Sequence, residues 1–191
     1  MGFRDTQAFN LVMLTKQAWR LVHDTHSLFY RVYKSRYFPK FSFMDVEVGS
    51  NSFYVWRSLL AARDVIFEGS KWKVGDGSRI KVSTHKWLSH KPIFLGEDRR
   101  NLYVKELIDN VSGQWDREKF FDLFAHKTRI EILQIPLSSV LVRDKLVWKE
   151  NQSQTFTVKS VFQIAQRLKN QSRVEHSRVG SQRKIWKKSG L

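Results

Sequence analysis

A short basic segment has the residue types and spacing of a phosphate-binding hairpin. The sequences K-W-K-V (71–74) and S-R-I-K-V (78–82) flank the turn G-D-G (75–77). A three-residue loop with Gly77 in the left-handed region predicts a β-hairpin in which Lys73 faces Arg79. In the same register Lys71 faces Lys81, on the same side of the strands. Like charges directly opposite each other destabilise a strand pair, and a bound phosphate backbone would relieve the repulsion. We therefore predict that these four basic residues bind nucleic acid; a solvated strand face is the alternative.

A second candidate site lies on the helix expected between residues 27 and 37. This segment alternates three tyrosines with the basic residues Arg31, Lys34 and Arg36. Basic residues beside aromatic rings are suited to neutralising phosphates while a base or sugar stacks on the ring. The alternative is that the tyrosines pack at the edge of the core. We predict that Arg31, Lys34 and Arg36 extend the nucleic-acid-binding surface.

Residue types that support catalysis or metal binding are sparse. Cysteine is absent, which excludes disulfides, thiolate metal sites and cysteine nucleophiles. Asp122 and His126 are spaced i, i+4 and could offer two metal ligands, but no third ligand is indicated. The sequence contains no G-x-S-x-G motif, no phosphate-binding G-x-x-x-x-G-K motif and no Asp-Asp pair. We therefore expect no catalytic residues, no metal and no cofactor, and a protein that is not an enzyme.

The charge of the chain indicates a polyanionic partner. The 191 residues include 34 Lys and Arg against 18 Asp and Glu, which gives a formal net charge of +16. Residues 1–100 contain 17 basic and 9 acidic residues, residues 101–166 are nearly balanced, and residues 167–191 are strongly basic. Such an excess favours nucleic acid or an acidic membrane surface. No apolar run is long enough to span a membrane and no secretory signal is visible, so we expect an intracellular protein, nuclear or cytoplasmic.

Hydrophobic periodicity and turn residues predict a mixed fold. Helices are expected from Asp5 or Thr6 to about residue 21, then over 27–37, 51–69, from 114 onward, 130–135 and 159–169. Strands are expected over 71–74 and 78–82, and again over 146–148 and 155–158, each pair forming a hairpin. The expected class is α+β, mainly helical with two small β-hairpins and a basic, disordered C-terminal tail.

Ordered short motifs connect the sequence with a known family. They are G-F-R-D from residue 2, A-F-N-L from 8, K-Q-x-W-R from 16, K-x-R-Y-F from 34, G-S-N from 49, Y-x-W-R-S from 54 and G-x-x-W-x-V-G-x-G from 69. Weaker matches are G-Q-W from 113, I-P-L-S from 135, D-x-L-x-W from 144 and F-T-V-K-S from 156. In this order and spacing they resemble a segment of plant LINE-type (non-LTR) retrotransposon polyproteins. His85-Lys86 stands where the family has Asp-Pro, and Gln154 where it has a turn glycine.

The resemblance implies a place between two modules of a longer protein. In the family the reverse transcriptase domain lies upstream, and a zinc-binding region and often an RNase H domain lie downstream. The motif R-K-I-W-K from residue 183 resembles the approach to the zinc-binding region, so we expect a truncated reading frame. The expected regions are a basic helical and hairpin connector (1–96), a helix and hairpin region leading to the zinc-binding module (97–169), and a basic tail (170–191).

The expected function is non-catalytic, sequence-tolerant binding of a nucleic-acid backbone. RNA, DNA and RNA–DNA hybrids all remain open as partners, because contact with phosphates reads neither base nor sugar. One alternative is a structural or protein-interaction module whose basic surface serves solubility or docking. Another is a degenerate product without a selected activity. The sequence leaves the oligomeric state open.

Overall fold

The computed structural model describes residues 5–47, 53–96, 101–137 and 142–171. The chain divides into two compact units. The first consists of Met1–Gly69 together with Phe156–Leu191, and the second of Ser70–Thr155. The boundaries expected after residues 96 and 169 therefore do not coincide with the boundaries of the compact units. The predicted disordered tail lies, from residue 172 on, outside the described residues.

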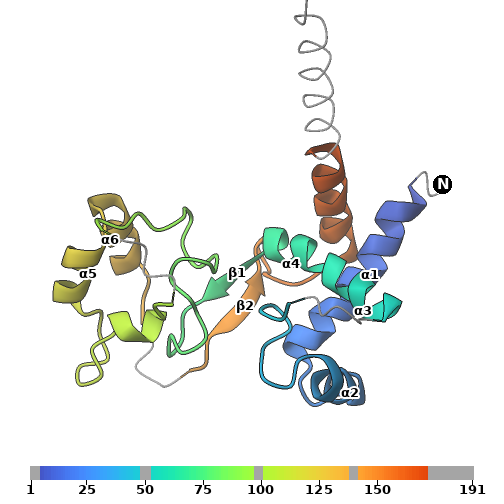
Figure 1. Cartoon of the computed structure of the whole chain (residues 1–191). Helices are drawn as coiled ribbons and strands as arrows, with labels where there is room; N and C mark the ends of the chain where they lie inside the picture. Colours follow the sequence, from blue (N-terminus) through green and yellow to red (C-terminus); the bar gives the residue numbers. More distant parts are fainter. Residues whose placement is uncertain (1–4, 48–52, 97–100, 138–141, 172–191) are drawn as a thin grey trace, which may run out of the picture. The chain divides into compact units, whose positions relative to one another are not determined.

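The first unit is helical (Figure 1). Its elements are α1 (Thr6–His23), α2 (Leu28–Tyr37), α3 (Tyr54–Ala61), α4 (Arg63–Gly69) and a helical stretch over residues 158–171. Helix α1 begins where the Asp5 carboxylate accepts a hydrogen bond from the Ala8 amide at 3.0 Å, and α2 begins where the Ser27 hydroxyl accepts one from the Tyr30 amide at 3.2 Å. Both predicted helix starts are confirmed. Helix α1 contacts α2, α3 and α4 and so forms the centre of this unit.

The helix predicted over residues 51–69 is in fact two helices separated at Ala62. The Ala62 amide donates to the carbonyl of Leu59 at 3.2 Å, which ends α3. The next residue, Arg63, donates from its guanidinium to the backbone carbonyls of Val46 and Met44. Its burial lowers the pKa of the Arg63 guanidinium, and the nearby Asp64 and Asp45 carboxylates oppose that shift. The break therefore directs a charged side chain onto the carbonyls of the preceding loop.

The core of the first unit contains an aromatic cluster around Trp56. The Trp56 side chain is stacked on Tyr37, with centroids 4.7 Å apart, and on Phe38 at 5.6 Å. Phe43 meets the same indole edge-on at 5.8 Å. Rings in these geometries bury large apolar areas and add a specific attraction. The prediction that Trp56 is a core residue is confirmed, since only 2% of it is exposed.

The second unit contains a small sheet and short helices joined by long loops. Its elements are β1 (Ser70–Lys73), η1 (Val104–Leu107), α5 (Arg117–Leu123), α6 (His126–Leu133) and β2 (Lys145–Trp148). Strands β1 and β2 pair antiparallel, with Trp72 opposite Leu146 and Lys73 opposite Lys145. The mixed, mainly helical class with a small antiparallel sheet is therefore confirmed. No helix among the described residues is long and apolar enough to cross a bilayer.

Both predicted hairpins are wrong. Strand β1 pairs with β2 and not with residues 78–82. Residues 80–82 lie instead along residues 102–104. There the Val82 amide donates to the Leu102 carbonyl at 2.8 Å, and the Val104 amide donates to the Ile80 carbonyl at 2.9 Å. In the second predicted hairpin, residues 155–157 form no strand, because Thr157 starts a helix by accepting a hydrogen bond from the Ser160 amide at 3.3 Å. Long-range pairing has replaced the local pairing that the sequence favoured.

A buried carboxylate holds the β1 turn in place. Asp144, 2% exposed, accepts hydrogen bonds from the amides of Gly75 at 2.7 Å, Gly77 at 2.9 Å and Arg79 at 2.8 Å. A Cβ atom at Gly75 would lie 2.1 Å from the carbonyl oxygen of Val142, so only glycine fits there. Gly77 has the predicted left-handed conformation, with φ +67°. The glycines thus allow the turn to close around the carboxylate immediately before β2.

Replacing Asp144 tests this interaction. We expect Asp144→Ala to lower the free energy of unfolding by about 3 kcal/mol, because the buried amide of Gly77 and the part-buried amides of Gly75 and Arg79 lose a charged acceptor. Asp144→Asn, which keeps one acceptor oxygen, should cost less. Urea unfolding followed by tryptophan fluorescence measures both changes. The control is Asp122→Ala on the exposed face of α5, which should change stability by less than about 0.5 kcal/mol. Equal effects of the two alanine variants would contradict the proposed role.

An ion pair in the first unit predicts a pH-dependent contribution to stability. The Lys169 ammonium lies 2.6 Å from the Asp5 carboxylate, and this hydrogen bond, followed by that of the Ala8 amide, lowers the pKa of Asp5 below 3.8. A depressed aspartate pKa stabilises the fold above the unfolded value and loses that effect as the pH falls through the folded pKa. Lys169→Gln should therefore lower the urea midpoint at neutral pH and lose its effect in acid. Lys159→Gln on the same helix is the control. A deficit that persists unchanged in acid would contradict the assignment.

Candidate nucleic-acid interface

Three lysines share the solvent side of the two-stranded sheet. Along β1 the side chains alternate, with Ser70 and Trp72 buried and Lys71 and Lys73 exposed. Lys73 is paired with Lys145 of β2, and residues directly opposite in an antiparallel pair point to the same side. We call Lys71, Lys73 and Lys145 the lysine face. Lys145 was missed by the sequence analysis, because its partner strand is more than 70 residues away in the chain.

The lysine face lacks internal neutralisation. Within the described part of the chain, none of its three ammonium groups forms an ion pair with a carboxylate. The nearest acidic residue in sequence, Asp144, is buried and accepts backbone amides instead. The directly opposed Lys73 and Lys145 repel each other, so an anion placed between them would be stabilising.

Arg79 and Lys81 lie elsewhere, which corrects the predicted four-cation face. The Arg79 guanidinium is 5.4 Å from the centroid of Trp72, and His85 stacks on the same indole at 5.2 Å. Since Trp72 is buried on the side of the sheet opposite to Lys71 and Lys73, Arg79 does not face Lys73. Lys81 is bridged to Tyr103, not to β1, and is half-buried. The physical reason is the pairing of β1 with β2, which removes the hairpin register.

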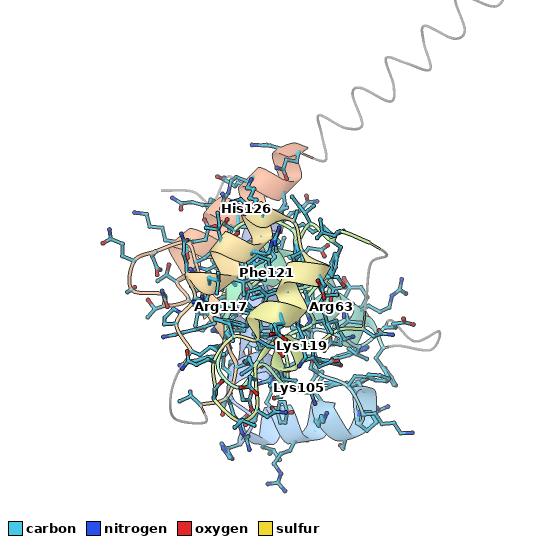
Figure 2. All side chains as sticks on the ribbon, turned by 90° about the vertical axis from the view of Figure 1, so that its left-hand side faces the viewer. Arg63, Lys105, Arg117, Lys119, Phe121 and His126 are labelled. Atoms are coloured by element: carbon cyan, nitrogen blue, oxygen red, sulfur yellow. The ribbon has the colours of Figure 1, made fainter. Side chains whose placement is uncertain are left out.

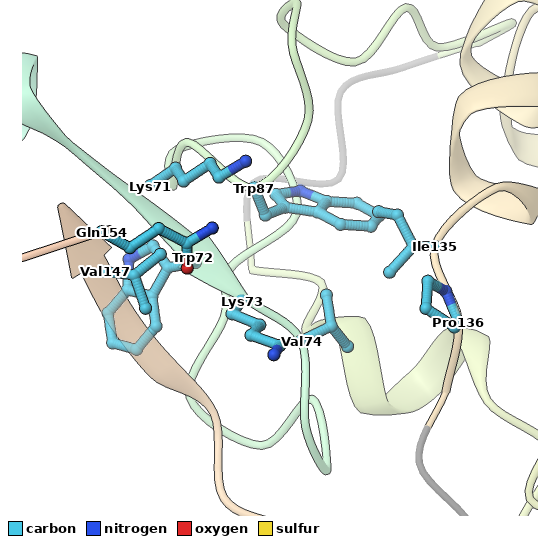
Figure 3. Close-up of a pocket in the computed structure, with 9 residues that line it drawn as sticks. All are labelled: Lys71, Trp72, Lys73, Val74, Trp87, Ile135, Pro136, Val147 and Gln154. Carbon is cyan, nitrogen blue, oxygen red and sulfur yellow. The ribbon is translucent and has the colours of Figure 1, made fainter. Parts of the chain in front are cut away.

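A pocket lies against the lysine face (Figure 3). Its volume is about 210 Å³, and the residues that line it are Lys71, Trp72, Lys73, Val74, Trp87, Ile135, Pro136, Val147 and Gln154. Most of the lining is apolar, and its polar residues are the two lysines and Gln154. In the close-up Gln154 and Val147 lie on one side of the pocket and Ile135 and Pro136 on the other. All of these residues belong to the second unit.

The predicted site on α2 is partly used for internal contacts. The Lys34 ammonium donates to the carbonyl of Phe41 at 2.7 Å, and the Arg36 guanidinium lies 4.7 Å from the centroid of Phe53. Arg31 is exposed. The tyrosines of α2 pack on other rings, as the alternative interpretation expected, with Tyr33 4.6 Å from Phe29. Arg31 and Arg36 keep their exposed positions on α2, in a different compact unit from the lysine face.

Tyr33 is further removed from solvent than an exposed surface tyrosine. Its desolvation, followed by the charge of the neighbouring Tyr37, raises the pKa of the Tyr33 hydroxyl above its ordinary value of 10.0. The ring is also within 6.0 Å of Trp56. Tyr33 is thus part of the aromatic cluster and is poorly placed to stack on a nucleobase.

One exposed lysine of α5 has a carboxylate partner. Figure 2 shows Arg117, Lys119 and Phe121 on α5 and His126 at the start of α6. The Lys119 ammonium is 2.9 Å from the Asp116 carboxylate. The same carboxylate accepts a hydrogen bond from the Lys119 amide and so caps α5. These contacts lower the pKa of Asp116. Such a neutralised lysine offers less to a polyanion than the members of the lysine face.

A histidine, a glutamate and a threonine form a hydrogen-bonded group that the sequence analysis missed. His90 Nδ1 is 2.6 Å from the Glu131 carboxylate, and its Nε2 is 3.2 Å from the Thr128 hydroxyl. Thr128 is fully buried and also accepts the Ile93 amide at 3.1 Å. A hydroxyl without access to solvent cannot attack a substrate, so these contacts attach the loop containing His90 to α6. No group of three His, Cys, Asp or Glu side chains gathers as a metal site in the described ranges.

Two proteins of Arabidopsis thaliana are similar to the chain. An uncharacterized mitochondrial protein is 40% identical over 88 residues, which cover 46% of this chain and 57% of that protein. A protein named "putative ribonuclease H protein" is 31% identical over 175 residues, which cover 86% of this chain and 28% of that protein. No family model and no solved structure matches the chain. The chain therefore spans only part of each relative, and the plant origin of both agrees with the plant family that its motifs resemble.

The Gln154 backbone gives a test of the turn beside the pocket. Gln154 is the residue at which the sequence analysis noted the loss of a turn glycine, and its φ is +52°, a left-handed value that favours glycine. Gln154→Gly should raise the free energy of unfolding by about 1 kcal/mol, because relief of left-handed strain exceeds the added chain entropy. Gln152→Gly, in the same turn, is the control and should destabilise slightly. If urea unfolding shows that Gln154→Gly is less stable than the wild type, the backbone of Gln154 is not strained.

Proposed function

We propose that this chain is a retrotransposon-related module that binds the phosphate backbone of nucleic acid without catalysing a reaction. The lysine face is the observation on which this proposal depends. Lys73 and Lys145 are directly opposed, Lys71 lies beside them on the same side, and all three are exposed. Binding a phosphate backbone there would replace their repulsion by attraction and release condensed counterions.

The comparisons support the choice of partner. Similarity to a protein named for ribonuclease H extends over 86% of this chain. The net charge of +16 also favours a polyanion. Together with the resemblance to LINE-type polyproteins, these facts favour a connector between the polymerase and the zinc-binding region of such a protein. This role requires an intracellular compartment that contains nucleic acid.

Phosphate contacts account for affinity and not for sequence preference. Lys71, Lys73 and Lys145 reach outward from adjacent strands and present point charges, which bind phosphates of any sequence. Arg31 and Arg36 of α2 are proposed as further phosphate contacts from the first unit. We expect no polymerase or nuclease activity from this chain, which primer-extension and RNA–DNA hydrolysis assays would check.

A protein-interaction role is the alternative, and one observation favours it. Phe53, Tyr54 and Val55 at the start of α3 are between 55% and 84% exposed. Three consecutive exposed apolar residues are typical of a contact surface. A folded chain that fails to bind nucleic acid at low salt would favour this role, or the absence of any selected activity.

Neutralising the lysine face tests the proposal. The triple variant Lys71→Gln, Lys73→Gln and Lys145→Gln should bind a labelled RNA–DNA hybrid more weakly than the wild type. The slope of log affinity against log salt, between about 50 and 200 mM, should become shallower by about two to three, since each lost phosphate contact contributes about 0.9. Fluorescence anisotropy measures both quantities.

A matched control removes the same charge from other places in the same unit. Lys91, Lys105 and Lys127 are exposed and lie outside both strands, so their replacement by Gln changes the net charge equally. We expect a much smaller change in slope, because only long-range attraction is lost. If both triple variants behave alike while circular dichroism shows intact folds, the lysine face is not the binding site.

A further inference from the structure

We infer that the pocket on the lysine face binds a single unpaired nucleobase, so that the chain prefers single-stranded nucleic acid to a duplex. This inference rests on the proposed function, because it assigns the partner of the same surface. The pocket lies beside Lys71 and Lys73, which are the residues proposed to bind phosphates. A nucleotide bound there would place its base in the pocket and its phosphate on the lysines.

The volume of the pocket fits one base. An apolar protein cavity of about 150 Å³ is large enough to bind benzene. The pocket here measures about 210 Å³, which leaves room for one pyrimidine or purine ring and not for a base pair. A base inside a duplex is stacked and paired, so it would have to leave the helix before entering. The size of the pocket therefore favours a single strand, whose bases are not paired.

The lining of the pocket has the chemistry of a base-binding site. Trp87 donates its indole N–H to the carbonyl of Val82 at 3.0 Å, so the ring presents carbon surface to the pocket. Val147 and Ile135 lie on opposite sides of the space and complete an apolar slot (Figure 3). Aromatic and apolar walls of this kind bind the faces of any base, because every base has an apolar π surface.

Gln154 adds a polar group at the edge of this slot. Its amide can both donate and accept hydrogen bonds, which matches the mixed edge of a nucleobase. Its left-handed backbone, with φ +52°, is unfavourable for glutamine, yet it positions this side chain on the pocket. The cost is consistent with a binding role for the amide.

The charges complete the arrangement. Lys71 extends toward Trp87 in the close-up, and Lys73 lies between the two sides of the pocket. Their ammonium groups can contact the phosphates on either side of a bound base, while Lys145, opposite Lys73, adds to the attraction. A slot for one base with cations around it distinguishes a single strand from a duplex, whereas cations alone do not.

The experiment uses the full chain and three labelled probes of equal length: an oligouridine strand, the same strand with abasic sites, and an RNA–DNA hybrid. Fluorescence anisotropy at constant salt gives their affinities. We expect the wild type to bind oligouridine about tenfold more tightly than the abasic strand, which is within the range for one stacked base. Val147→Phe, which fills the pocket without changing charge, should remove this preference.

Val111→Phe is the matched control, because Val111 is exposed in the same unit and does not line the pocket. It should retain the preference for bases. Equal wild-type affinities for oligouridine and the abasic strand would overturn the pocket assignment while leaving backbone binding in place. Absence of binding to all three probes at low salt would overturn the proposed function itself. The abasic comparison needs no variant, so a misfolded Val147→Phe protein would not prevent a decision.

Discussion

The second compact unit depends on one buried carboxylate. Asp144 accepts the amides of Gly75, Gly77 and Arg79, and β2 begins at the next residue. Burying a carboxylate without hydrogen-bond donors would lower the stability of the fold, so the three amides are needed to offset the desolvation of Asp144. The same contacts join two segments separated by about 65 residues, next to the point where β2 pairs with β1.

The surface chemistry of this unit follows from that strand pairing. Because Lys73 lies opposite Lys145, two like charges meet on the exposed side of the sheet, and Lys71 extends the same patch. The side chains of Trp72 and Leu146 point the other way and are buried. One pairing thus produces both a core and an unneutralised cationic face, beside which the pocket lies.

The first unit uses its aromatic residues differently. Tyr37 and Phe38 stack on Trp56, and Arg36 lies over Phe53, so rings that could stack on bases are occupied by internal contacts. Its exposed cations, Arg31 among them, can still attract phosphates over long range. In the first unit, therefore, these aromatic rings serve internal contacts while Arg31 remains exposed.

The sequence alone determined the properties that depend on local residues: the helix starts at Asp5 and Ser27, the left-handed Gly77, the mainly helical class and the positive charge. Capping side chains and glycine conformations act within a few residues, so a local pattern specifies them. Only the tertiary structure decided that β1 pairs with β2 and that Lys145, not Arg79, faces Lys73. Pairing with either partner strand is compatible with the alternation of buried and exposed residues along β1. The observed pairing is accompanied by the hydrogen bonds of Asp144 to Gly75, Gly77 and Arg79, long-range contacts that no local spacing encodes.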